Sequence, residues 1–263
     1  MNKTNIVLIT GAGTGIGRAL SIAAAEKGFD VILVGRTSGT LDETMSKCNP
    51  NAVRHIIADV TSAEGRALIA KTVNGSLDIL INNAGTLRVG HLEDMADADL
   101  EQMTDTNLVA PMALTRELLP ALRKSKGQIV NIGSVFGDIA YPFFAGYSAT
   151  KFGLRGFSDA MRRELSGAGI GVTYIAPRAT RTAKETAFEK LIEPMGMTLD
   201  SAEAVAFQAW DAILKKKRES FPSGKERFFV KVQRLFPSLV DKFVSAQARD
   251  PRTLAALKGS AKT

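Results

Sequence analysis

Residues 3–17 read Lys3-Thr-Asn-Ile-Val-Leu-Ile-Thr10-Gly11-Ala-Gly13-Thr14-Gly15-Ile16-Gly17. The short apolar, β-branched run up to Thr10 is typical of a buried strand. It leads into a glycine-rich turn and then into a predicted helix from about Arg18 to Lys27, which ends at Gly28. A turn of this kind lets the backbone approach a pyrophosphate at a helix N-terminus, although it can also serve tight packing alone. We therefore predict a dinucleotide site that includes Gly11, Gly13, Thr14, Gly15, Ile16 and Gly17, with Gly11, Gly15 and Gly17 as the relevant glycines.

The end of the second predicted strand indicates which dinucleotide is favoured. This strand runs from Asp30 to Gly35 and is followed by Arg36 and Thr37. An acidic residue at the strand end would hydrogen-bond a ribose 2′-hydroxyl and repel a 2′-phosphate, but the position is Gly35. A guanidinium matches phosphate in both geometry and charge. The sequence thus favours NADP(H) over NAD(H), with Arg36 and Thr37 at the cofactor; the alternative is an Arg36 that faces solvent.

Helices and strands continue to alternate after this point. A predicted helix over 38–47 precedes a strand over 53–58, and a further strand covers 77–82. Asp59-Val60 follows the first of these strands, where the carboxylate either accepts from an adenine amino group or caps the next helix. Asn82-Asn83-Ala84-Gly85 forms a small-residue turn at the end of the second, which is where a doubly wound sheet binds its ligand.

A second group of polar residues indicates acid–base chemistry. Tyr147 and Lys151 stand four apart at the start of a helical pattern, so both side chains lie on one helix face. A free phenol has a pKa of about 10, and a nearby cation lowers it toward the range that a general acid–base needs. Ser134 follows a predicted strand over 127–133 and can hydrogen-bond the same substrate oxygen. These residues predict proton transfer at an alcohol or carbonyl oxygen, which requires a hydride partner.

Size and charge limit the remaining possibilities. The chain has 263 residues and no linker-like stretch, which favours one domain over 1–222 and a C-terminal extension over 223–263. No apolar run reaches the ~18 residues of a membrane span, and no signal peptide precedes the first strand. The only cysteine is Cys48, and His55 and His91 lack metal-ligand spacing, so we expect a cytoplasmic protein without a metal.

The chain resembles the short-chain dehydrogenase/reductase family. The resemblance covers roughly residues 3–220 and rests on the glycine-rich turn, Asp59-Val60, Asn82-Asn-Ala-Gly85, Asn107, Ser134, Tyr147-x-x-x-Lys151, and Pro177 with Thr182. It implies an α/β fold, a three-layer Rossmann-type doubly wound parallel sheet in the order 3-2-1-4-5-6-7, with helices on both faces and here a C-terminal helical extension. It also implies a homodimer or homotetramer, built in part by the helices near 98–124 and 147–166.

The same resemblance implies roles for individual residues. Tyr147 is expected to donate and accept the proton, Lys151 to bind the nicotinamide ribose, and Ser134 to orient the substrate oxygen. Asn107 is expected to hold a helix bend and a water in a proton relay. The other expected cofactor contacts come from Asp59, Val60, Asn83, Ala84, Gly85, Pro177, Arg178 and Thr182.

One residue departs from the usual family pattern, and two stretches are expected to shape the substrate pocket. Arg178 stands after Pro177, where the family usually has a small residue. We expect its side chain to contact a cofactor phosphate or an acidic substrate group, or else to face solvent. Aromatic and apolar residues between Ser134 and Tyr147 and in 183–198 predict an apolar cavity suited to a lipid-like, steroid-like or aromatic carbonyl compound. The expected pocket residues are Phe136, Tyr141, Phe144 and Met195, although ordinary core packing claims some of the apolar residues in these stretches.

The C-terminal extension is basic and amphipathic. Residues 215–263 hold thirteen Lys or Arg and four Asp or Glu, whereas the rest of the chain has a net charge of −2. Over 225–245, apolar residues recur at helical intervals, and Pro237 should begin a second helix or break the first. We expect this segment either to pack within the chain or a dimer, covering the substrate entrance, or to contact an anionic membrane peripherally. The segment contains no recognisable nucleic-acid-binding module.

Three functions fit these patterns. The favoured one is an NADPH-dependent reductase of a small, largely apolar ketone or aldehyde, reversible with the secondary alcohol, in which Tyr147 is the general acid–base. The second is a 3-oxoacyl-thioester reductase of lipid metabolism, whose basic residues would meet an acidic carrier protein. The third is a catalytically silent NADP(H)-binding regulatory protein, which the intact Ser134, Tyr147 and Lys151 oppose.

Overall fold

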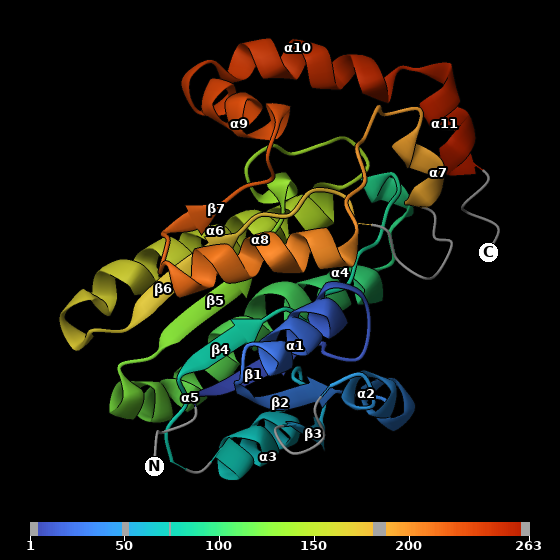
Figure 1. Cartoon of the computed structure of the whole chain (residues 1–263). Coiled ribbons are helices and arrows are strands. Elements are labelled where there is room, and N and C mark those ends of the chain that lie inside the picture. The colour runs from blue at the N-terminus through green and yellow to red at the C-terminus, as the bar shows by residue number, and fades with distance from the viewer. Residues whose placement is uncertain (1–4, 49–52, 74, 181–187, 259–263) are drawn as a thin grey trace.

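The computed structural model describes residues 5–48, 53–73, 75–180 and 188–258. Within these residues a parallel sheet of seven strands has the order β3-β2-β1-β4-β5-β6-β7 (Figure 1). The strands are β1 Ile6–Thr10, β2 Asp30–Gly35, β3 Val53–Ile57, β4 Ile79–Asn82, β5 Gln128–Ile132, β6 Gly171–Ile175 and β7 Glu219–Ser220. The predicted fold class and strand order are therefore confirmed.

The helices that the apolar patterns predicted lie where expected, with ends that differ by a few residues. They are α1 Gly15–Glu26, α2 Ser38–Met45, α3 Ala63–Val73, α4 Asp97–Thr104, α5 Ala110–Ser125, α6 Ala145–Glu164, α7 Glu189–Ile192, α8 Ala202–Leu214, α9 Lys225–Leu235, α10 Pro237–Ala248 and α11 Pro251–Lys258. Pro237 begins α10, as expected from its fixed φ and missing N–H. The patterns did not predict α7, α8 or α11.

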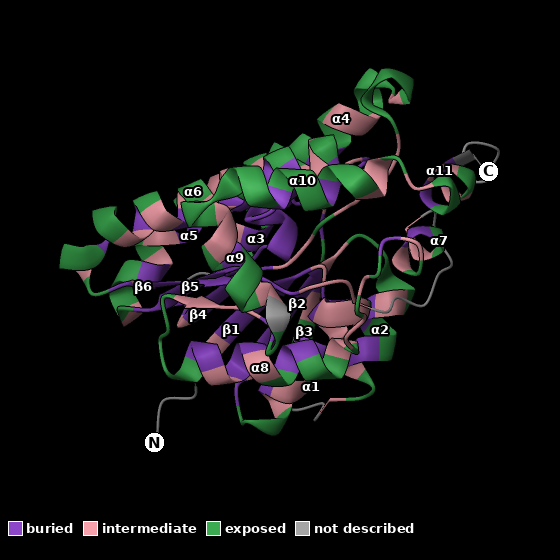
Figure 2. Cartoon of the chain, turned by 90° about the horizontal axis from the view of Figure 1, so that it is seen from above, coloured by how far each residue is buried: buried purple, intermediate pink, exposed green. Residues whose placement is uncertain are grey.

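Two apolar layers enclose the sheet because alternate side chains of a strand face opposite ways. In β1, Val7 and Ile9 pack with α1 and α8, whereas Leu8 packs with α3, α5 and α6. Trp210 of α8 is almost wholly buried in the first layer, and its indole N–H donates to the Leu20 carbonyl of α1 at 3.1 Å. Figure 2 shows the same arrangement as a buried sheet between exposed helix faces.

The apolar faces that the resemblance assigned to subunit contact are largely used within the chain. Leu122 of α5 and Leu154, Met161 and Leu165 in and after α6 are buried. Leu122, Met161 and Leu165 pack against the sheet and its neighbouring helices, so the burial of these three is already explained without a partner. Assembly into a dimer or tetramer stays a prediction.

The C-terminal helices cover one end of the sheet. In Figure 1, α9 follows β7 and α10 runs along the outer boundary of the molecule toward α11 and α7. Val230 of α9 and Val240 and Val244 of α10 pack against Ile139, which follows β5. Leu257 of α11 packs with a separate apolar cluster that includes α7. None of the described helices is both long and apolar enough to cross a bilayer.

Candidate active site

A cleft of about 590 Å³ lies at the carboxyl ends of the strands, where β1 pairs with both β2 and β4 and the strand order reverses. Open parallel sheets bind ligands at this position. The predicted site residues that line it are Gly11, Thr14, Gly15, Ile16, Gly17, Arg36, Asp59, Val60, Asn83, Ala84, Gly85, Ser134, Phe136, Tyr147, Lys151, Pro177 and Arg178. Thr182 lies outside the described residues.

The glycine-rich turn forms one wall of the cleft. Gly15 has a φ of +51°, and a Cβ built on it would meet no atom within 4 Å, so the absent side chain leaves open space at the start of α1. A Cβ on Gly17 would collide with the Gly11 carbonyl oxygen. Gly13 differs from the prediction because it does not line the cleft: a Cβ there would collide with Thr40 of α2, so this glycine serves packing. The open cradle at a helix N-terminus fits a phosphate group.

The turn after β4 is fastened to the glycine-rich turn. The Thr10 hydroxyl accepts from the backbone N–H of Asn83 at 2.9 Å and of Ala84 at 3.0 Å. The Asn83 side chain donates to the Thr10 carbonyl at 2.8 Å. Asn83 therefore holds the two strand ends together, which fixes the width of this part of the cleft.

The wall near β2 and β3 carries a positive charge. Arg36 is exposed and lines the cleft directly after Gly35, whereas Thr37 precedes α2 and does not line it. Burial acts to raise the pKa of Asp59, but the hydrogen bonds from Thr61 and the charge of Arg36 together lower it below its ordinary value. Asp59 is thus a carboxylate whose Oδ1 already accepts from Thr61, at 2.9 Å from its N–H and 2.8 Å from its hydroxyl.

Tyr147 and Lys151 lie in the first two turns of α6, and Ser134 follows β5. The Lys151 Nζ lies 5.6 Å from the centroid of the Tyr147 ring and donates to the Ile132 carbonyl at 3.0 Å. Ser134 and Tyr147 both line the cleft. The Ser134 hydroxyl accepts from the Phe136 N–H at 3.1 Å, which fixes its direction. The structure therefore brings the three predicted catalytic residues together.

Burial dominates the electrostatics of this group. It raises the pKa of Tyr147 to about 12, against the lowering effect of the Ser134 hydrogen bond. It lowers the pKa of Lys151 to about 8, because the charged ammonium is removed from water. The sequence argument that the Lys151 cation brings the pKa of Tyr147 down therefore does not describe this structure, in which burial raises that pKa.

Asn107 lies behind the cleft in a π-helical segment, Asp105–Val109, that joins α4 to α5. The resemblance implied a helix bend at Asn107, and the structure has this irregular segment there. Its buried amide accepts from the Thr86 N–H and donates to the Thr86 carbonyl, both at 2.8 Å, and it donates to the Thr150 hydroxyl of α6 at 3.1 Å. Asn107 thus ties the turn after β4 to the helix of Lys151; its place in a proton relay stays a prediction.

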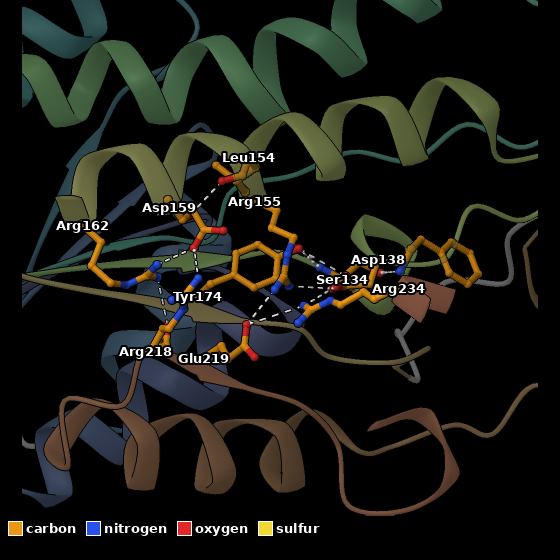
Figure 3. Close-up of polar contacts among 12 residues, drawn as sticks. Ser134, Asp138, Leu154, Arg155, Asp159, Arg162, Tyr174, Arg218, Glu219 and Arg234 are labelled. Carbon is orange, nitrogen blue, oxygen red and sulfur yellow. Dashed lines mark hydrogen bonds and ion pairs between the residues drawn. The ribbon is translucent and has the colours of Figure 1, made fainter. Parts of the chain in front are cut away.

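A buried ionic network that the sequence argument missed supports Ser134 from behind (Figure 3). The Tyr174 hydroxyl accepts from the Ser134 N–H at 3.4 Å and donates to the Ser134 carbonyl at 3.3 Å. Arg155 lies over the Tyr174 ring at 5.2 Å and binds Asp138 at 2.8 Å and Glu219 at 2.7 Å. Arg155 stands one helical turn after Lys151, and this spacing was the one sign in the sequence that Arg155 lies near the catalytic residues.

The network also reaches the C-terminal extension. The Asp138 side chain is only 2% exposed and receives Arg234 of α9 at 2.9 Å. Burial raises the pKa of Asp138 even though Arg155 and Arg234 act to lower it. The loop that follows Ser134 is therefore bound both to α6 and to α9.

Arg178 has a different environment from those considered in the sequence. It lines the cleft, but its guanidinium binds Asp200 through two hydrogen bonds of 2.8 and 2.7 Å and Glu226 through one of 2.9 Å. These carboxylates satisfy the charge that was expected to meet a cofactor phosphate, an acidic substrate group or solvent. Arg178 therefore joins the segment after β6 to the first turn of α9.

Only part of the predicted substrate pocket borders the cleft. Phe136 lines it, together with Phe188 from the predicted 183–198 segment and with Leu87, which the sequence did not assign to the pocket. Phe144 and Met195 are buried in the apolar cluster beneath α7 and α11, and Tyr141 stacks on Phe136 with 4.8 Å between ring centroids. These three residues do not line the cleft because α11, which was not predicted, completes the cluster that encloses them.

Comparison with known proteins gives a consistent picture. The sequence model described as short chain dehydrogenase matches residues 5–191. A protein from Nostoc sp. named ketoacyl reductase HetN is 33% identical over 219 residues, which are 81% of this chain and 76% of that protein. The 3-oxoacyl-[acyl-carrier-protein] reductase FabG of Staphylococcus aureus is 32% identical over 230 residues, which are 80% of this chain and 93% of that protein.

A solved structure also matches along most of both chains. It is a short-chain dehydrogenase from Sphingobium yanoikuyae in complex with NADPH, with a TM-score of 0.75 and 26% sequence identity. The match covers 90% of this chain and 96% of that one.

Proposed function

The chain belongs to the short-chain dehydrogenase/reductase family, and from this premise we propose that it is an NADPH-dependent carbonyl reductase. The reaction converts a small, largely apolar ketone or aldehyde to its alcohol and is reversible. The observation that carries the proposal is the meeting of Ser134 and Tyr147 beside Lys151, in a cleft whose other end is a glycine cradle.

The residues present fit a bound nicotinamide dinucleotide. The open space at Gly15 and the start of α1 suit the pyrophosphate, and the exposed Arg36 suits a 2′-phosphate where an acidic residue would repel it. Lys151 stands beside Tyr147 and would bind the nicotinamide ribose. NADPH supplies the hydride that the carbonyl carbon receives.

The chain itself supplies the proton and the alignment. The Tyr147 hydroxyl gives its proton to the carbonyl oxygen as negative charge develops there, and the Ser134 hydroxyl donates a hydrogen bond to the same oxygen. A pKa near 12 keeps Tyr147 protonated at neutral pH, which suits an acid in the reductive direction. The Lys151 ammonium stabilises the tyrosinate that is left.

The cleft favours an apolar substrate. Leu87, Phe136 and Phe188 line the end nearest Tyr147, so the group attached to the carbonyl meets aliphatic and aromatic carbon. The similarity to HetN and FabG supports a second candidate, a 3-oxoacyl-thioester reductase, since both are named for reducing ketoacyl compounds. The basic C-terminal surface would then meet an acidic carrier protein.

A substrate panel tests the proposal. We expect NADPH oxidation with apolar ketones or aldehydes, and a loss of about 10³-fold or more in kcat/KM in Tyr147→Phe, which removes the proton donor. Activity confined to acyl thioesters would favour the second candidate. NADPH binding without turnover on any ketone, aldehyde or thioester would indicate a silent binding protein and contradict both.

Cofactor preference has its own test at Arg36. In Arg36→Ala the KM for NADPH should rise by about tenfold or more, because one charge-assisted contact to the 2′-phosphate is lost. The KM for NADH, which lacks that phosphate, is the internal control and should stay the same. An unchanged KM for NADPH would remove Arg36 from the cofactor site.

A further inference from the structure

The outer side of α9 and α10 exposes six large apolar side chains. These residues, which we term the tail face, are Phe228, Phe229, Leu235, Phe236, Leu239 and Phe243. Phe228 is 65% exposed, Leu235 71% and Leu239 58%. Contiguous apolar surface of this kind on a folded chain marks a site of contact with a partner or a membrane.

The exposure does not arise from loose packing of the helices. Each helix buries a second set of apolar residues against the body of the protein, namely Val230 in α9 and Val240 and Val244 in α10. Arg234 fixes α9 further by its ion pair with the buried Asp138. The helices are therefore anchored on one side, and the tail face is left over on the other.

The aromatic part of the tail face is continuous across the two helices. The rings of Phe229 in α9 and Phe243 in α10 stack at 6.4 Å, and Phe228 packs edge-on to Phe229 at 6.1 Å. Figure 1 shows α10 at the outer boundary of the molecule, and Figure 2 shows it largely exposed. A flat support can therefore reach both helices at once.

The charge around the tail face indicates which kind of surface it contacts. Residues 227–249 contain five Lys or Arg and one acidic residue, Asp241. Arg234 is turned inward to Asp138, whereas Arg227, Lys231, Lys242 and Arg249 are exposed beside the tail face. A two-fold contact with a second copy would bring two such basic surfaces together, which charge repulsion opposes. Beside an anionic bilayer they are attracted, while Phe and Leu enter the headgroup boundary.

We propose that the tail face docks the protein onto the surface of an anionic lipid bilayer, with α9 and α10 lying in the interface. The docking surface adjoins the edge of the sheet that carries the cleft, because Arg178 lines the cleft and binds Glu226 in the first turn of α9. Docking is a property of the folded surface and does not require turnover.

Co-sedimentation of the full chain with vesicles tests the proposal. We expect the protein to pellet with vesicles of equal parts phosphatidylcholine and phosphatidylglycerol, and far less with phosphatidylcholine alone. The triple variant Phe228→Ser, Leu235→Ser, Leu239→Ser should lose about tenfold or more of this partitioning, since three side chains no longer enter the interface. Lys231→Glu with Lys242→Glu should weaken binding to anionic vesicles only.

A matched control separates the tail face from exposed apolar residues in general. Phe207 of α8 is 80% exposed but lies outside the tail face, so Phe207→Ser should pellet like the parent. Circular dichroism melts check that all variants fold. Equal, negligible pelleting of the parent with both vesicles would overturn the proposal. Concentration-dependent dimerisation that the triple variant abolishes, without vesicle binding, would assign the tail face to a second copy and also overturn it.

Discussion

The Tyr174 hydroxyl is the side-chain group that holds the backbone of Ser134 from behind the cleft, where the Ser134 carbonyl also accepts from the Gly137 N–H at 2.9 Å. It bonds both the N–H and the carbonyl of that residue, and the cation of Arg155 lies over its ring. We predict that Tyr174→Phe lowers kcat/KM for reduction on the order of tenfold, because Ser134 is no longer fixed in direction. In a Ser134→Ala background the same change should have little further effect.

The chain offers a matched control for this prediction. Tyr141→Phe removes the same atom from a tyrosine that stacks on Phe136 but does not bind Ser134. It should leave kcat/KM within about twofold of the parent, since its hydroxyl has no part in placing the serine. If Tyr174→Phe lowers kcat/KM as much in the Ser134→Ala background as in the parent, Tyr174 does not act through the Ser134 hydroxyl.

Lys151 predicts a pH dependence of stability. Its pKa is lowered from 10.5 to about 8 in the folded protein, so between these values the unfolded chain holds a proton that the folded one has lost. The free energy of unfolding therefore rises with pH in this window. Tyr147 acts in the opposite sense only above pH 10, because its pKa is raised from 10.0 to about 12.

Urea unfolding at about pH 8 and about pH 10 measures this effect. Relative to Lys151→Met, the parent should gain about 2 kcal/mol between the two values, since Met carries no titrating group. The comparison uses the change in unfolding free energy between the two pH values in each protein. The loss of the hydrogen bond to Ile132 in the variant is the same at both pH values and therefore cancels. Parallel pH profiles for both proteins would contradict the lowered pKa of Lys151.

At the scale of elements, the start of α9 is held by Arg178, a residue for which the sequence predicted a different role. Arg178 was expected near a cofactor phosphate or an acidic substrate group, or facing solvent, but it binds Asp200 and Glu226. We predict that Arg178→Ala leaves the KM for NADPH within about twofold and speeds amide exchange in 225–235, because two carboxylates lose their cation. Arg36→Ala is the comparison: it should raise the KM for NADPH and leave amide exchange in 225–235 unchanged. A raised KM with unchanged exchange would restore the phosphate role.

Helix and strand positions could largely be predicted from the sequence, because periodicity and glycine turns are local signals. The segment near Asn107 shows the limit of this reasoning. A bend was expected there from the resemblance, but its form, a π-helical segment between α4 and α5, depends on hydrogen bonds to Thr86 and Thr150 from distant parts of the chain.

At the scale of the whole molecule, the strand order and the grouping of Ser134, Tyr147 and Lys151 were predictable, whereas the far end of the cleft was not. Phe144 and Met195 were expected in the pocket because they are apolar and lie between Ser134 and Tyr147 or within 183–198. Their burial depends on α7 and α11, which meet only in the folded chain. The network of Tyr174, Arg155 and Asp138 was likewise invisible, because its members come from β6, α6 and the loop after β5.

The position of Trp210 has a practical consequence. It is the only tryptophan in the chain, it is buried between α8 and α1, and its indole is bonded to the helix that starts at the glycine cradle. Intrinsic fluorescence excited at the indole therefore reports on a single location. A shift of its emission toward longer wavelength marks the separation of these two helices, so the protein carries a built-in optical probe for the half of the sheet that receives the dinucleotide.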